Sequence, residues 1–200
     1  MPLYHSAAET MTLLITTSRE PTRRIRTLGH DLNRVISGSQ WINRGRLNHE
    51  GVIAEAIALG ADRVMFLERW KGAPGKIELH LLRPEDRVYY PVIYLSSVTL
   101  QSEIQGSASI RAGLVASITS REQLQLKPLA EALAFFLQVP LTSSEDASLA
   151  SPPVPPFPPR LFFDSKGPRI TVTFKNKLDT EIGPRLEIKK LAWSDRSQSL

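Results

Sequence analysis

The alternation of strand-like and helix-like segments in the first third of the chain constrains the fold most strongly. Short apolar runs at 11–17 and 63–69 predict buried strands, and residues 40–43 predict a short strand between them. Apolar residues recur at helical spacing after Pro21 and again after Asn48, which predicts two amphipathic helices. A strand–helix–strand–helix–strand order of this length predicts parallel strands covered by helices.

The remaining segments predict further α/β structure. We expect a helix whose apolar positions run from Leu124 to Leu137, capped by Thr119 or Ser120, with Pro128 setting its start near Lys127 or kinking it there. Further strands are expected at 76–83, 92–97, 110–119, 160–164, 169–175 and 185–193. The sequence therefore predicts the α/β fold class.

A segment rich in serine and proline, residues 143–159, interrupts this pattern. Proline has no backbone N–H and a fixed φ, so six prolines in the second part of the segment exclude a regular element. We expect an exposed, extended loop. A proline-rich ligand for an aromatic groove on another protein is the alternative.

Composition excludes several classes of site. The chain has no cysteine, which excludes disulfides, cysteine nucleophiles and thiolate metal sites. Its four histidines show no metal-binding spacing, and neither a phosphate-binding Walker loop nor a dinucleotide fingerprint is present. We therefore expect no catalytic residue, no metal and no cofactor. No apolar run approaches the roughly 18 residues of a membrane span, and the N-terminus lacks signal-peptide features, so we expect a soluble cytoplasmic protein.

Positive charge is concentrated near the first predicted helix. The chain carries a net charge of +5, and its segment 19–46 alone holds seven arginines against two acidic residues. Basic loops follow the first strand and also the short second one, at Asn43–Arg46. Because both loops leave the carboxyl ends of neighbouring parallel strands, we expect them to form one patch wide enough for a polynucleotide backbone.

Hydroxyl and guanidinium groups in these loops are the candidate phosphate ligands, since both donate hydrogen bonds and arginine adds charge. The last predicted strand is expected to extend the surface through Arg185 and two lysines. The candidate RNA-binding residues are Thr17, Ser18, Arg19, Arg23, Arg24, Arg26, Arg44, Arg46, Arg185 and Lys189. A solvated helix face explains the arginines equally well on composition alone. A small-phosphate-binding enzyme that uses Thr16 to Ser18 is a further alternative, although no acid or base converges there.

Three motifs in order along the chain resemble the Brix-domain family. Residues 16–26, Thr-Thr-Ser-Arg-Glu-Pro-Thr-Arg-Arg-Ile-Arg, resemble the family's opening strand and basic helix start. Asn43-Arg44-Gly45 is similar to the motif after the second strand, and residues 183–188 are similar to the Gly-Pro-Arg-led segment near the end of the domain. Within the family, the likeness is to the archaeal Imp-four-like group. Glu20 departs from the pattern, because the family often has a basic residue there.

The resemblance implies a fold, an organisation and a role. It implies two α/β halves related by a pseudo-twofold, each resembling the anticodon-binding domain of class II aminoacyl-tRNA synthetases. The expected organisation is a flexible tail at 1–10, a Brix domain at 11–194 and a C-terminal tail at 195–200; the halves lie at about 11–100 and 101–194. The implied role is non-catalytic ribosome biogenesis, with ribosomal RNA precursor and pre-ribosomal proteins as partners.

Overall fold

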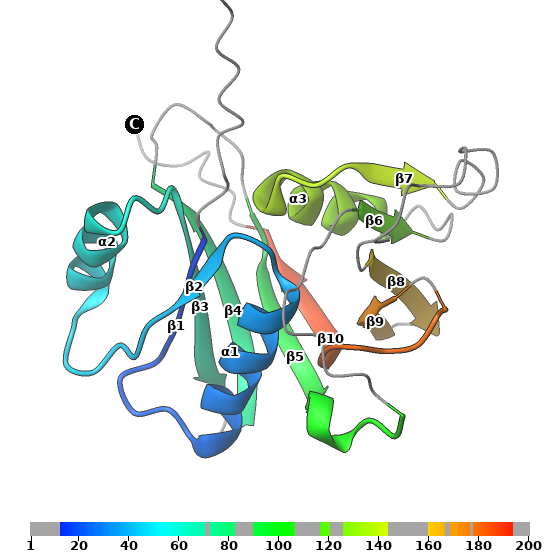
Figure 1. Ribbon diagram of the computed structural model, residues 1–200, viewed down its shortest axis with the longest axis horizontal. Coiled ribbons are helices and arrows are strands. Elements are labelled where there is room, and N and C mark those ends of the chain that lie inside the picture. The colour runs from blue at the N-terminus through cyan, green and yellow to red at the C-terminus, as the bar shows by residue number, and fades with distance from the viewer. Residues whose placement is uncertain are drawn as a thin grey trace, which may run out of the picture.

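One curled sheet organises the described fold. The structure is a computed structural model that describes residues 13–70, 73–82, 90–106, 117–120, 126–143, 160–166, 169–176 and 178–193. Within these ranges ten strands form a single sheet in the order β2-β1-β3-β4-β5-β10-β9-β8-β6-β7 (Figure 1). Three α-helices and a short 3-10 helix, η1, accompany it. The expected α/β class is confirmed.

The first five strands contain the predicted crossover unit. Strand β1 lies between β2 and β3 and is parallel to both, while β4 and β5 add antiparallel neighbours. The elements are β1 (Leu13–Thr17), α1 (Arg23–Val35), β2 (Ser39–Trp41), α2 (His49–Ala58), β3 (Arg63–Trp70), β4 (Ala73–Leu81) and β5 (Val92–Thr99). The prediction of parallel strands joined by helices is therefore confirmed for this part of the chain.

The last five strands repeat this order. Strand β6 is parallel to β7 and β8, and β8, β9 and β10 follow in antiparallel succession. The order β7-β6-β8-β9-β10 thus has the same directions as β2-β1-β3-β4-β5, and an antiparallel β5–β10 pair joins the two sets. The remaining elements are η1 (Gln101–Glu103), β6 (Ser117–Ser120), α3 (Lys127–Leu137), β7 (Leu141–Ser143), β8 (Arg160–Lys166), β9 (Arg169–Lys175) and β10 (Arg185–Ala192).

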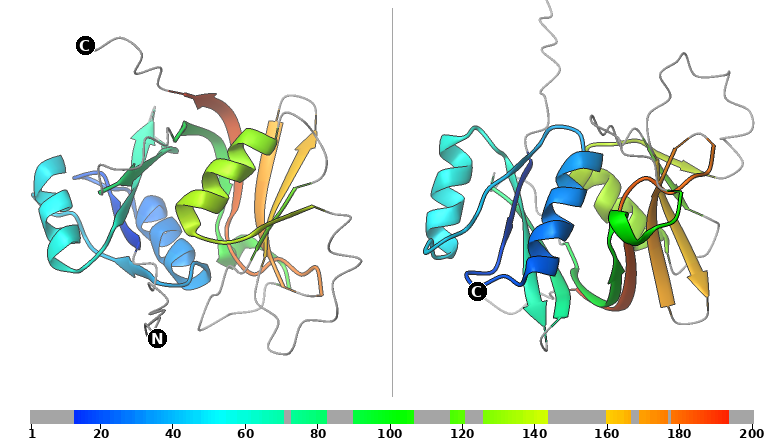
Figure 2. Two further views of the ribbon diagram at one scale, coloured as in Figure 1. Left: turned by 90° about the horizontal axis from the view of Figure 1, so that it is seen from above. Right: turned by 60° about the horizontal axis from the view of Figure 1, so that its bottom comes forward.

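Two apolar clusters lie on opposite faces of the sheet. The larger cluster joins α1 and α3 to residues of β1, β3, β4, β5, β8, β9 and β10 on the inner face of the curl. The smaller one packs α2, through Val52 and Ala56, against Leu14, Val64 and Phe66 on the outer face. Figure 2 shows α1 and α3 within the curl and α2 outside it. Both sets of strands therefore share one core.

A side-chain cap starts helix α1, and a glycine allows it to pack closely on the sheet. The Thr22 side chain accepts a hydrogen bond from the backbone N–H of Ile25, which satisfies one free donor of the first turn. The apolar stripe of the helix is buried, and Gly29 faces the Trp41 ring so closely that a Cβ there would lie 1.9 Å from a ring atom. Gly29 thus allows α1 to approach β2 closely.

Helix α3 differs from its prediction at the N-terminus. It begins at Lys127 with Pro128 in the first turn, as predicted, because proline fits where no backbone N–H is needed. The N-cap is Leu126, which makes no side-chain cap, so the expected cap at Thr119 or Ser120 is wrong. At the other end, buried Arg63 of β3 donates a hydrogen bond to the Phe136 carbonyl (2.9 Å) and lies 3.4 Å from Asp62. This arginine joins β3 to the end of α3.

Several expectations concern residues outside the described ranges. These are the tails at 1–10 and 195–200, residues 110–116 of the strand expected at 110–119 and, except for Ser143 at the end of β7, the loop at 143–159. Strand β7 was not predicted, and its last residue, Ser143, lies in the segment expected to be a loop. None of the helices in the described part of the chain is long and apolar enough to cross a membrane.

Candidate nucleic-acid interface

The junction between β1 and α1 presents arginines to solvent, as the sequence predicts. Arg19 follows the strand, and Arg23 and Arg26 lie on the first turns of the helix. All three residues are exposed. Positions 23, 26, 30 and 34 share the helix face opposite the buried stripe, because they are separated by three or four residues. This face therefore carries three arginines and His30.

The second basic loop lies beside the first. The Leu47 carbonyl accepts hydrogen bonds from Nε of Arg44 (3.2 Å) and from Nε of Arg19 (3.4 Å). The loops after β1 and β2 are thus bridged by one acceptor, and the prediction that they lie side by side is confirmed. Arg46, in the second loop, is exposed.

We call Arg19, Arg23, Arg26 and Arg46 the arginine surface. All four are exposed, and none has an ion-pair partner among the residues that the structure describes. Exposed Arg69 is the second-last residue of β3, which lies beside β1 and runs parallel to it, so Arg69 emerges at the same edge of the sheet. The sequence alone does not point to Arg69, because only the sheet order places it beside β1. Exposed guanidinium groups at one edge, none of them in an ion pair within the described ranges, can each bind a phosphate oxygen.

Two other predicted arginines, Arg24 and Arg44, make contacts within the protein that hold the fold together. Arg24 makes a bidentate pair with Glu103 of η1 (2.5 and 2.7 Å) and donates to the Val98 carbonyl. This hydrogen-bonded pair raises the pKa of Arg24 and lowers that of Glu103. The Arg44 side chain is only 11% exposed, packs 5.4 Å over the Phe66 ring and lies 3.7 Å from Glu68. Neither arginine is as available to a ligand as the arginine surface.

The predicted hydroxyl ligands are turned inward. Thr17 is 1% exposed and its hydroxyl donates to the Ser18 carbonyl, while the Thr16 hydroxyl donates to the Ile42 carbonyl. The Ser18 Oγ atom is also buried, with no hydrogen-bond partner in the described part of the molecule. The expectation that Thr17 donates to a bound phosphate therefore does not fit its buried position.

The predicted residues of the last strand lie apart from the arginine surface. Arg185 pairs with Glu181 (2.9 Å), and Lys189 is exposed in an irregular part of the β5–β10 pairing. Strands β3, β4 and β5 separate β10 from β1. The structure thus does not bring Arg185 or Lys189 together with the arginines of the two loops.

Aromatic side chains near this edge differ in exposure. Trp41 packs on α1 and stacks with His30, with ring centroids 4.8 Å apart. Trp70, beside Arg69 at the end of β3, is 46% exposed and contacts the Tyr94 ring edge to face at 5.0 Å. Trp70 therefore offers a surface for base stacking, while Trp41 is largely used in packing.

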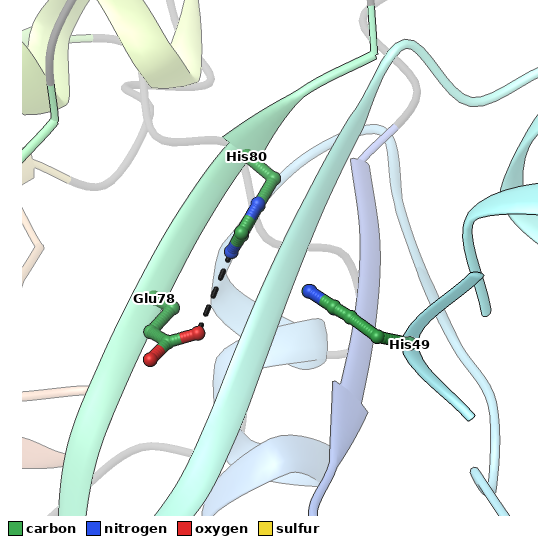
Figure 3. Close-up of side chains that lie close together, drawn as sticks. All are labelled: His49, Glu78 and His80. Carbon is green, nitrogen blue, oxygen red and sulfur yellow. Dashed lines mark ion pairs between the residues drawn. The ribbon is translucent and has the colours of Figure 1, made fainter. Parts of the chain in front are cut away.

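A separate cluster brings together residues that sequence spacing does not relate. His49 at the start of α2 faces Glu78 and His80 of β4, and their ligand atoms all lie within 4.8 Å of one another (Figure 3). Hydrogen bonds with His80 and Lys76 lower the pKa of Glu78 to about 2. The pKa of His49 is also lowered, mainly by burial and to a smaller extent by the nearby His80 and Arg44. The cluster was missed because 29 and 31 residues separate His49 from its neighbours in sequence.

The fold and the exposed arginines define a class: a mixed α/β protein with a curled sheet and a positively charged edge. No protein-family model matches the chain. Curated relatives do match, all named Brix domain-containing ribosomal biogenesis proteins of archaea. The chain is 39% identical to the Pyrococcus horikoshii relative over 125 residues, 62% of this chain and 56% of that one. It is 29% identical to the Aeropyrum pernix relative over 183 residues, 89% of this chain and 95% of that one.

Solved structures agree with these matches. The crystal structure of a ribosomal biogenesis protein from Aeropyrum pernix has a TM-score of 0.71 at 25% identity, covering 90% of this chain and 96% of that one. The archaeal Imp-four-like protein Mil has a TM-score of 0.61 at 19% identity, over 90% and 99% of the two chains, which shows a shared fold. The resemblance to the archaeal Brix-domain family predicted from the three motifs is therefore confirmed. The match to each Pyrococcus relative spans 56% of that relative's length.

Proposed function

We propose that this chain is a non-catalytic, RNA-binding factor of ribosome biogenesis that assists rRNA precursor processing and small-subunit assembly. The observation that carries the proposal is the arginine surface, four exposed guanidinium groups at one edge of the sheet. The names of the relatives support the role in ribosome biogenesis. The proposed partners are ribosomal RNA precursor and pre-ribosomal proteins, and the proposed location is the cytoplasm.

Backbone phosphates are the proposed target of this surface. Arg23 and Arg26 stand one turn apart on α1, and Arg19 is linked to the second loop through the Leu47 carbonyl, so the groups form one array. Such an array suits a run of phosphates better than a single small ligand. Arg34 and His30 on the same helix face, and Arg69 with Trp70 on β3, extend the proposed surface. Thr17 is left out because it is buried.

A salt series tests the proposal. Four phosphate contacts on single-stranded RNA predict a log–log slope of affinity against salt of about −3, from roughly −0.7 for each contact. We expect Arg23→Glu/Arg26→Glu to weaken binding by roughly tenfold or more and to reduce the slope by about 1.4. The matched control is Lys127→Glu/Arg169→Glu, exposed residues of the second half, which lowers the net charge by the same amount.

The control separates a site from a general charge effect. Both double variants change the formal charge from +5 to about +1, so non-specific attraction falls equally in the two. Equal loss of affinity in both variants would contradict a localised surface. Unchanged affinity in Arg23→Glu/Arg26→Glu would contradict the proposed surface itself.

We also infer that the Brix domain spans about 11–194 and that its halves are related by a pseudo-twofold, each resembling the anticodon-binding domain of class II aminoacyl-tRNA synthetases. The repeated strand order and the antiparallel β5–β10 pair support this symmetry. Helices α1 and α3 occupy corresponding places, after the first strand of each half.

The phosphate-ligand enzyme has less support than the RNA-binding factor. It requires hydroxyls open to a ligand, and those of Thr16 and Thr17 are buried and bonded internally. A thermal-shift screen with nucleotides distinguishes the two, because only the enzyme predicts saturable stabilisation by one small compound. The protein-binding role of the proline-rich loop concerns residues outside the described ranges.

A further inference from the structure

The His49 cluster has the composition of a metal site. Glu78 and His80 are two residues apart on β4, so their side chains lie on the same face of the sheet. They point toward His49, which lies in the first turn of α2 (Figure 3). His80 Nε2 lies 3.5 Å from Glu78 Oε2, and the His49 and His80 ring centroids are 4.9 Å apart. Two imidazoles and a carboxylate from two elements, α2 and β4, thus lie together.

One ring nitrogen of His49 lacks a partner. The Nδ1 atom of His49 is buried, and it neither donates nor accepts a hydrogen bond within the described structure. The ring instead packs edge to face on Phe66, with centroids 4.2 Å apart. A buried polar atom without a partner is uncommon and calls for a reason.

We propose that His49, Glu78 and His80 bind one divalent transition-metal ion, with zinc the best suited. Imidazole and carboxylate ligands together suit zinc, and three protein ligands leave a fourth tetrahedral position for water. Ligands at about 2.0–2.1 Å in a tetrahedron stand about 3.3 Å apart, so the donor atoms must approach by up to about 1.5 Å. All three residues are partly exposed, and the two histidines can make this change by rotation of their side chains.

The charged neighbours of the cluster partly balance one another. Lys76 Nζ lies 2.6 Å from Glu78 Oε1, which fixes the carboxylate and leaves Oε2 directed toward His80. Lys76 also lies 2.5 Å from Glu68, and Arg44 lies 3.7 Å from the same Glu68. Glu68 therefore partly balances the two nearby cations, and Glu78 supplies the negative charge at the site.

Metal titration of the full chain tests the proposal. The chain is freed of metal with a chelator, and Zn²⁺ is titrated against a chromophoric competitor; Co²⁺ is added separately to record its visible spectrum. We expect one ion per chain, bound through histidine and oxygen in a tetrahedral geometry. The absence of cysteine and the presence of only four histidines limit competing sites.

Variants assign the ligands. His49→Ala and His80→Ala should each weaken zinc binding by roughly tenfold or more, and the isosteric Glu78→Gln should do the same while keeping the packing. The control His30→Ala, an exposed histidine on α1, should bind as the unchanged chain does. No zinc binding by the unchanged chain, or binding unaltered in all three ligand variants, would overturn the proposal. Circular dichroism of each metal-free variant verifies its fold.

Discussion

Helices α1 and α3 follow equivalent strands in the repeated order, yet they present opposite chemistry to solvent. The exposed face of α1 carries Arg23, Arg26 and Arg34. The exposed face of α3 carries one lysine, Lys127, which lies 3.9 Å from Glu131, and an exposed Phe135. Of these two helices, only α1 thus presents a basic face. The four predictions below test how each helix is held in the fold and which arginines of α1 are available to RNA.

The largest expected effect comes from one hydrogen bond between the two sets of elements. Arg63→Met removes the buried hydrogen bond to the Phe136 carbonyl at the end of α3 and leaves that carbonyl unpaired. We expect a loss of about 2–3 kcal/mol in the free energy of unfolding, measured by denaturant titration. Arg69→Met, on the exposed end of the same strand, should stay within about 0.5 kcal/mol. Equal losses would contradict the role of Arg63.

The next effect concerns the packing of α1 against β2. Gly29→Ala places a methyl group against the Trp41 ring and should destabilise the protein by about 1–3 kcal/mol. Trp41→Leu makes room, so the cost of Gly29→Ala should fall in that background, as a double-mutant cycle would measure. The same cost in both backgrounds would show that the close approach of α1 to β2 is unimportant.

A smaller effect distinguishes the two helix starts. Thr22→Ala removes the side-chain cap of α1 and should reduce stability by about 1 kcal/mol in thermal unfolding, while Thr22→Ser should retain it. Helix α3 has no such cap, since Leu126 precedes it. A loss in Thr22→Ser as large as in Thr22→Ala would contradict capping as the cause.

The smallest expected change in RNA affinity separates neighbouring arginines. Arg24→Ala removes the pair with Glu103 and should lower the melting temperature while leaving RNA affinity within about twofold. Arg23→Ala should reduce the salt slope by about 0.7 and leave the melting temperature unchanged. Filter binding and thermal unfolding of the two variants provide both readouts, and a reversed pattern would contradict the division of roles.

The local part of this picture could be predicted from sequence. Apolar runs predicted β1 and β3, and helical spacing after Pro21 and after Asn48 predicted α1 and α2. Which arginines are free could not be predicted, because Glu103 lies 79 residues after Arg24 and meets it only through the fold. The burial of Thr17 could not be predicted either, because the sequence does not show that strand β1 stays buried up to its last residue.

Crosslinking of RNA to the protein tests the central proposal most directly. Ribosomal RNA precursor fragments are crosslinked to the full chain, and the modified peptides are mapped by mass spectrometry. The proposal predicts modification within residues 19–46, which include the arginine surface, and none within α3 at 127–137. Crosslinks concentrated on α3 or β10, with residues 19–46 unmodified, would contradict it.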